Sequence, residues 1–161
     1  MLIAVPFTGG CACGAIRYEC SAAPLLVWKC HCRTCQQATG TAFNINVLVL
    51  ATALKFTKGE PKYYAVKAES GGQLHRGFCS ACGSPVGAKS DAFSDIRGVY
   101  AGSMDDPSGL ERPAGGLFGP TDPEVRETAD GRGISNVDGR VGLASLRKWR
   151  SEVLACGGKC S

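Results

Sequence analysis

Apolar and polar residues alternate along several short segments in the first two-thirds of the chain. In residues 15–20, Ile16, Tyr18 and Cys20 fall on one side of the alternation and charged residues on the other. Residues 43–50 hold the longest such run. A period of two is typical of a half-buried β-strand, so both segments are predicted strands, the second being the longest in the chain. Further strands are expected at residues 25–28, 54–56, 63–66, 74–78 and 97–101.

The connections between these segments carry turn-forming residues. Residues 59–61 and 70–72 contain glycine or proline and separate neighbouring strand candidates. Residues 33–39 can form one or two helical turns, which Gly40 would end. Short strands separated by turns, with little helix, predict a mainly β, antiparallel architecture.

The last third of the chain has a different composition. Residues 105–161 contain 10 of the 22 glycines and only two aromatic residues, Phe118 and Trp149. Such a segment buries too little apolar surface to offset the entropy of ordering it. We therefore expect a single domain over residues 1–107 and a divergent, poorly ordered, irregular tail over residues 108–161. A shifted reading frame near residue 108 is one hypothesis for this change.

Charge and hydropathy exclude several classes of partner. The net charge is only +4, and no cluster of five or more Lys and Arg residues occurs, so a nucleic-acid partner is not expected. No stretch approaches 18 apolar residues, and the first residues lack the basic start of a secretion signal. We expect a cytoplasmic protein without a membrane partner. In that reducing compartment, ten cysteines favour metal ligands or reactive thiols over disulfides.

Seven of the ten cysteines fall into three tight groups, which are Cys11 with Cys13, Cys30 with Cys32 and Cys35, and Cys79 with Cys82. Cys20 stands alone and is expected to pack on its strand. Cys156 and Cys160 form a loose pair in the predicted tail, for which a third metal site is a minor alternative. Ligands from one short segment lose little extra entropy when they close on a metal.

Cys79 and Cys82 form a Cys-x-x-Cys motif followed directly by Gly83. The glycine can adopt a positive φ and turn backbone N–H groups toward the sulfur atoms, as in a zinc knuckle. A redox pair is the alternative, but such pairs open helices, and Pro85 argues against a helix here. Metal binding is therefore the favoured interpretation.

Cys11 and Cys13 lie between two glycines. In an extended segment residues i and i+2 face the same side, so both sulfur atoms can reach one ion. With Cys79 and Cys82 they would complete a closed site of four thiolates, the usual structural zinc arrangement. Two small buried cysteines without metal are the alternative.

Cys30, Cys32 and Cys35 then remain as three ligands with an open fourth position, the pattern of a catalytic zinc. Spacing alone does not force this division, because Cys32 and Cys35 with Cys79 and Cys82 would also make a zinc ribbon. His31 would point away from the metal in an extended segment. A supporting or proton-transfer role is expected more than ligation, and plain surface packing is the remaining alternative. The residues predict one zinc, favour a second, and leave the pairing open.

Read in order, these motifs resemble the glutathione-dependent formaldehyde-activating enzyme family, which is also named for centromere protein V. The matching segments are Gly9-Gly-Cys11-Ala-Cys13-Gly, Cys30-His-Cys32-Arg-Thr-Cys35, Phe78-Cys79-Ser-Ala-Cys82-Gly83 and Gly102-Ser-Met-Asp105-Asp-Pro107. The resemblance covers roughly residues 8–107. It implies an antiparallel β-tent fold that binds two zinc ions per chain.

The resemblance also implies a role for each cysteine group. Cys11, Cys13, Cys79 and Cys82 match the family's structural zinc site, and Cys30, Cys32 and Cys35 match its catalytic site. The implied activity is that of a carbon–sulfur lyase, which condenses glutathione with formaldehyde or cleaves such adducts. The implied partner is a small-molecule thiol, glutathione in the namesake reaction. Three basic residues, Arg17, Arg33 and Arg76, are candidates to attract the carboxylates of glutathione.

Two other functions remain open from the sequence. A zinc-stabilised binding module without turnover would carry the same cysteines, since a fold does not fix a function. A lyase of the same fold could also act on a different thiol or electrophile.

Overall fold

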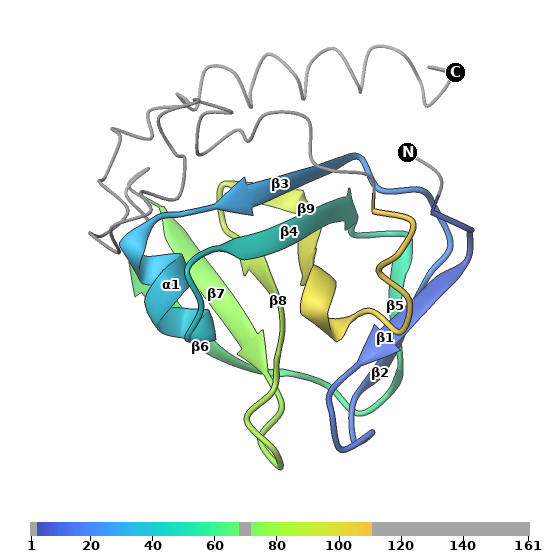
Figure 1. The fold of residues 1–161 in the computed structure, drawn as a ribbon, viewed down its shortest axis with the longest axis horizontal. Coiled ribbons are helices and arrows are strands. Elements are labelled where there is room, and N and C mark those ends of the chain that lie inside the picture. The colour runs from blue at the N-terminus through green and yellow to red at the C-terminus, as the bar shows by residue number, and fades with distance from the viewer. Residues whose placement is uncertain (1–2, 68–71, 111–161) are drawn as a thin grey trace, which may run out of the picture.

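The computed structural model of the protein describes residues 3–67 and 72–110, which form two antiparallel sheets (Figure 1). The smaller sheet has the strand order β1 (Phe7–Gly10), β2 (Arg17–Cys20) and β5 (Leu54–Lys58). The larger sheet has the order β3 (Leu26–Cys30), β4 (Asn44–Leu50), β9 (Phe93–Tyr100), β8 (Pro85–Ser90), β7 (Gln73–Phe78) and β6 (Lys62–Lys67). The mainly β, antiparallel fold class predicted from the sequence is confirmed.

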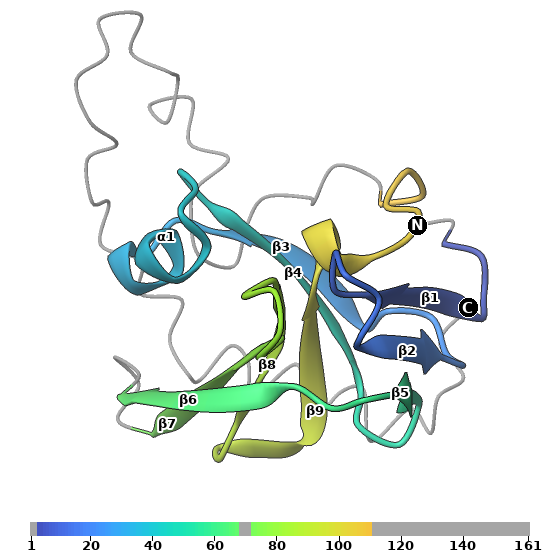
Figure 2. The same ribbon diagram turned by 90° about the horizontal axis from the view of Figure 1, so that it is seen from below.

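Helix is confined to two short elements in the described residues. Helix α1 (Arg33–Thr39) ends at Gly40, whose φ of 67° is the left-handed conformation that favours glycine. The predicted helical turns and their stop are thus confirmed. A single 3₁₀ turn, η1 (Ala101–Ser103), follows β9. Figures 1 and 2 place α1 at one end of the molecule and the smaller sheet at the other.

The predicted strands at residues 15–20, 25–28, 43–50, 54–56, 63–66, 74–78 and 97–101 all correspond to strands in the structure. One detail is wrong: β9, with eight residues, is longer than β4, with seven. Strand β9 begins at Phe93, which pairs with Ser90 of β8. Its start was not predicted because Ser94 and Asp95 are polar and interrupt the apolar pattern. Strands β1 and β8 were not predicted at all.

The core lies between the two sheets. Tyr18 from the smaller sheet packs in one cluster with Val47, Val49 and Val99 from the larger one, and all four are at most 2% exposed. The alternation predicted for β2 is confirmed, because Ile16, Tyr18 and Cys20 are buried while their neighbours are not. Burial of such side chains contributes about 1.5–3 kcal/mol each, so packing between the two sheets stabilises the fold.

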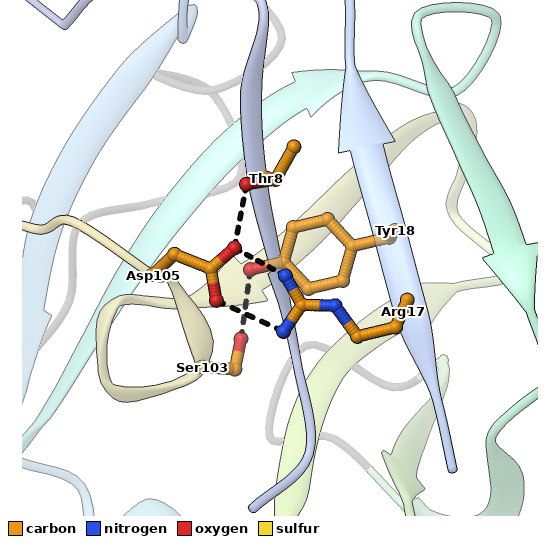
Figure 3. Close-up of polar contacts among 5 residues, drawn as sticks. All are labelled: Thr8, Arg17, Tyr18, Ser103 and Asp105. Carbon is orange, nitrogen blue, oxygen red and sulfur yellow. Dashed lines mark hydrogen bonds and ion pairs between the residues drawn. The ribbon is translucent and has the colours of Figure 1, made fainter. Parts of the chain in front are cut away.

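A group of polar contacts fastens the end of the described chain to the smaller sheet (Figure 3). The Tyr18 hydroxyl is hydrogen-bonded to the Ser103 hydroxyl at 3.0 Å. The Arg17 guanidinium forms an ion pair with Asp105 that uses both carboxylate oxygens, and the Thr8 hydroxyl donates to the same carboxylate. We call these five residues the clasp. It holds η1 and residue 105 against β1 and β2.

Gly9 in β1 is required by this close approach. A Cβ at that position would lie 2.3 Å from the Ser103 carbonyl oxygen, which is shorter than any side chain tolerates. An isolated bridge pairs Gly9 with Met104 at the same place. The glycine therefore lets the chain after η1 pass directly over β1.

The predicted tail lies outside the described residues from 111 onward, as do Cys156 and Cys160. The domain boundary near residue 107 stays a prediction. In residues 3–67 and 72–110, no helix has the length and apolar character needed to cross a membrane.

Candidate metal centres

The structure gathers seven cysteines into two groups. Within each group the sulfur atoms all lie within 4.8 Å of one another. The first group is Cys11, Cys13, Cys79 and Cys82, and the second is Cys30, Cys32 and Cys35. The alternative ribbon, in which Cys32 and Cys35 join Cys79 and Cys82, is not formed by the described residues.

Two similar loops present the four sulfur atoms of the first group. In the loop after β7, the Gly83 N–H donates to the Cys79 carbonyl at 2.8 Å, and Gly83 has a φ of 76°. In the loop after β1, the Gly14 N–H donates to the Cys11 carbonyl at 3.1 Å, and Gly14 has a φ of 71°. Each loop is therefore a turn that folds back over its cysteines.

The expectation that Cys11 and Cys13 share a side in an extended segment is wrong. A turn brings their sulfur atoms to 3.5 Å instead, and it also aims the Ile16 N–H at the Cys11 sulfur from 3.2 Å. The reason is Gly14, whose positive φ reverses the chain directly after Cys13. The sulfur atoms still converge, so the predicted grouping survives the error in geometry.

The spacing of the four sulfur atoms fits a tetrahedral metal site. Four ligands at the usual zinc–sulfur bond length of about 2.3 Å lie about 3.8 Å from one another. The distance is 3.5 Å from Cys11 to Cys13 and 3.8 Å from Cys13 to Cys79. Four soft sulfur ligands at tetrahedral spacing suit zinc better than hard cations such as magnesium or calcium.

Protonation in the first group is uneven. Hydrogen bonds from the side chain and backbone of Ser84 lower the pKa of Cys82 to about 6. The backbone bond from Ala15 favours the Cys13 thiolate, but the adjoining sulfur atoms of Cys11 and Cys82 outweigh it and raise the pKa of Cys13 to about 11. The crowded sulfur atoms thus differ in how readily they ionise, and a divalent cation at their centre would favour the thiolate form of all four.

The second group is built from one short segment. Cys30 ends β3, Cys32 precedes α1 in an extended conformation, and Cys35 lies in the first turn of α1. The Cys35 N–H donates to the Cys32 carbonyl at 3.0 Å, which turns both side chains to one side. The sulfur atoms of Cys30 and Cys32 are 3.3 Å apart.

Hydrogen bonds inside this group also shift the pKa values of its thiols in opposite directions. Bonds from Cys30 and then Cys35 lower the pKa of Cys32, and the bond to Cys32 raises that of Cys30. Cys30 and Cys35 are buried, at 7% and 6% exposure, whereas Cys32 is half-buried. Three sulfur atoms at this spacing can hold a soft cation and leave one coordination position without a protein ligand from the group.

The sequence matches a model of the family described as glutathione-dependent formaldehyde-activating enzyme, over residues 6–118. The match spans well over half of the chain and includes all seven grouped cysteines. The chain belongs to this family.

A solved structure supports the fold of this family member. It is the crystal structure of a Rhodobacter sphaeroides protein from a structural genomics programme, with 20% sequence identity and a TM-score of 0.51. The similarity covers 66% of this chain and 96% of the other. At this identity the likeness concerns the fold alone.

In this family member, Arg76 lies beside the second cysteine group. It is only 9% exposed, and its Nη2 lies 3.6 Å from the Cys35 sulfur. Arg76 was predicted from the sequence to attract substrate carboxylates, and its contact with Cys35 was not predicted. One signal was present: in the alternation of β7, Arg76 takes the place of an apolar residue between Leu74 and Phe78.

Two buried asparagines also lie near the second cysteine group. Asn44 and Asn46 on β4 are each 7% exposed, and the Asn44 Nδ2 donates to the Asn46 Oδ1 at 3.1 Å. Asn44 is the strand partner of Cys30, and Asn46 that of Tyr100. Because paired residues share a face of the sheet, the asparagines lie on the same side as Cys30 and Tyr100.

The other predicted residues occupy varied places. His31 packs its ring against Phe43, with centroids 5.4 Å apart, and it is not among the grouped ligands. Its buried Nδ1 has no hydrogen-bond partner in the described part of the chain. Arg17 belongs to the clasp, and Arg33 starts α1 with its side chain exposed. Cys20 is fully buried on β2.

Proposed function

We propose that the protein is a zinc-dependent carbon–sulfur lyase of the glutathione-dependent formaldehyde-activating type, present in the cytoplasm. Two zinc ions per chain are assigned, a structural one to Cys11, Cys13, Cys79 and Cys82, and a catalytic one to Cys30, Cys32 and Cys35. The single observation that carries this proposal is the three-sulfur group. Among the described residues, no fourth His, Cys, Asp or Glu joins it.

The proposed reaction joins glutathione and formaldehyde. The sulfur of glutathione forms a bond to the aldehyde carbon, the carbon–oxygen π bond breaks, and the proton of the thiol ends on the oxygen. The product is S-hydroxymethylglutathione, and the reverse reaction cleaves it. A thiol with a pKa near 8.5 is mostly protonated at neutral pH, so its ionisation limits its reactivity.

Zinc at the second group would supply positive charge that favours ionised thiols. The protein's own contribution is position. Cys30 and Cys35 are buried and Cys32 is half-buried, so the group is reached from the side of Cys32. The wall of Asn44, Asn46 and Tyr100 offers polar groups beside it, and His31 with Phe43 forms the adjoining surface. Holding both reactants near this wall raises their effective concentration.

The test is exchange spectroscopy of glutathione with formaldehyde in the presence of the zinc-loaded protein. We expect the wild-type protein to accelerate the exchange and Cys32→Ala to reduce it to the uncatalysed rate. Cys20→Ala is the matched control, because it removes a sulfur outside both groups and should keep the wild-type rate. Equal rates for wild type and Cys32→Ala would leave a binding module or a lyase for another substrate.

A further inference from the structure

Arg76 is a buried cation whose contacts point toward the second cysteine group. Its side chain is 9% exposed, its Nη2 reaches the Cys35 sulfur at 3.6 Å, and its Nη1 donates to the Tyr100 hydroxyl at 3.4 Å. A guanidinium stays charged at any physiological pH. Burying it is costly unless an anion and hydrogen bonds compensate.

The described neighbours of Arg76 offer one anionic partner. Across the strands it faces Tyr64 and Ala88, which are uncharged. In the described residues no carboxylate lies within 4 Å of its nitrogen atoms. The Cys35 sulfur, which would be a thiolate in a metal-loaded group, is therefore the partner that would balance its charge.

Charge at the site then depends on Arg76. Three thiolates around a divalent cation have a net charge of −1, and a fourth thiolate would bring it to −2. Taking such an anion into a partly buried site is unfavourable. When the fixed positive charge of Arg76 beside Cys35 is added, the net charge is 0 with three thiolates and −1 with the fourth. The site therefore accepts an anionic ligand more readily.

We propose that Arg76 is the positioning residue that lets the three-cysteine site accept its substrate as a thiolate anion rather than as a neutral ligand. This inference rests on the proposed function, since it concerns the ligand of the same site. It defines the substrate class by charge, an exogenous thiol bound in its ionised form. Arg76 acts through Cys35 and does not itself react.

The geometry also explains why this residue is arginine. One arm of the fork contacts Cys35 and the other contacts Tyr100, so the hydroxyl of Tyr100 fixes the plane of the guanidinium. A lysine carries the same charge on a single ammonium group without the fork. Lysine should therefore preserve the charge effect and lose part of the orientation.

The experiment measures ligand binding without turnover. Cobalt replaces zinc in the purified full chain, and the charge-transfer and visible bands are titrated with 2-mercaptoethanol, which binds as a thiolate, and with imidazole, which binds as a neutral molecule. We expect Arg76→Gln to weaken the thiolate by at least about tenfold and to leave imidazole within about twofold. Arg76→Lys should keep thiolate affinity within about threefold of the wild type.

Arg97→Gln is the matched control. It removes the same charge from the same sheet, where Arg97 donates to the carbonyl oxygens of Ser94 and Ile96 at 2.8 and 2.9 Å. Arg76 pairs with Ala88 and Ala88 with Gly98, so Arg97 lies on the opposite face of the sheet. Its substitution should change neither ligand's affinity.

The outcomes separate the two proposals. If wild-type cobalt protein shows no spectral change with the thiol, the proposed thiol chemistry fails and the role of Arg76 with it. If the wild type responds and Arg76→Gln binds the thiolate equally well, or loses both ligands equally, only the role of Arg76 is overturned. Should Arg76→Gln not fold, Arg76→Met fills the same buried path with an apolar chain and has the same expected result. A tenfold loss of thiolate in Arg76→Lys would also contradict a role based on charge.

Discussion

The two cysteine groups are similar in chemistry and opposite in construction. The four-cysteine group joins loops of different sheets, and Cys13 and Cys79 are 66 residues apart in the chain. The three-cysteine group comes from a single strand-to-helix connection. A metal at the first group would therefore close a long loop of the chain, whereas a metal at the second would close only a very short loop.

This difference separates stability from chemistry. A metal that joins distant segments restricts the unfolded chain strongly and holds the two sheets together, and such binding energy is folding energy. A metal held by one local segment contributes less to the fold, because its ligands are already close together. The local group also has three ligands and a buried arginine beside it. We therefore expect the fold to depend on the four-cysteine group and the proposed reaction on the three-cysteine group.

The largest expected effect comes from breaking the four-cysteine group. Cys13 is exposed, so Cys13→Ser buries no new polar group, yet it removes one ligand of the long-range site. Structural zinc contributes about 10 kcal/mol or more in small zinc domains. We expect the Tm to fall by more than about 10 °C, measured by circular dichroism on zinc-loaded protein.

Cys32→Ser is the matched substitution in the other group, since Cys32 is only half-buried. It should lower the Tm by less than about 5 °C and remove one zinc per chain. Equal losses of Tm in the two variants would contradict the division between a stabilising and a reactive site.

Most of the fold could be predicted, because hydrophobic alternation is a local signal. Strands β1 and β8 were missed because packing required residues that disfavour strands. A Cβ at Gly9 would lie 2.3 Å from the Ser103 carbonyl oxygen, and a Cβ at Gly87 would lie 2.3 Å from that of Gly98. Glycine is therefore needed in both strands, and β8 also begins with a proline, Pro85. Tertiary contacts overrode the local preference.

The candidate site shows the same limit. The cysteine groups could be proposed from motifs, and the division between them came from the family resemblance. The contact of Arg76 with Cys35 could not, because it joins β7 to α1 across 41 residues of sequence. The turn at Cys11 was also missed. Glycine can adopt either sign of φ, and the cysteine spacing does not reveal that Gly14 has a positive φ.

A smaller effect is expected in the release of metal. Removing zinc with an excess of chelator should proceed in two phases, the faster one from the three-cysteine group because it has fewer ligands and one half-buried member. The fast phase should be absent in Cys32→Ser, and circular dichroism should change only during the slow phase. A chromogenic zinc indicator follows the release. A single phase in which the metal and the fold are lost together would contradict this prediction, because it would show that the two sites are not independent.

The smallest effect concerns the clasp. Like the four-cysteine group, the clasp is expected to stabilise the fold, because it holds η1 and Asp105 against β1 and β2. The ion pair to Arg17, followed by the Thr8 hydrogen bond, lowers the pKa of Asp105 below its ordinary 3.8. A carboxyl with a lowered pKa in the folded state stabilises the protein above the unfolded value, and this contribution is lost as the pH falls through the folded one. Both side chains are more than a third exposed, so solvent screening limits the contribution to about 1 kcal/mol or less.

Asp105→Asn should therefore lower the free energy of unfolding slightly at pH 7, and its difference from the wild type should shrink as the pH falls below about 4 and through the lowered pKa of Asp105. Urea titrations of both zinc-loaded proteins between pH 7 and pH 3 measure this difference, in which acid losses common to both cancel. The thiolate affinity of the cobalt protein should not change, because Asp105 contacts the smaller sheet and not the three-cysteine group. A loss of thiolate affinity in Asp105→Asn would show that the clasp reaches the reactive site, and the two regions would then no longer be independent.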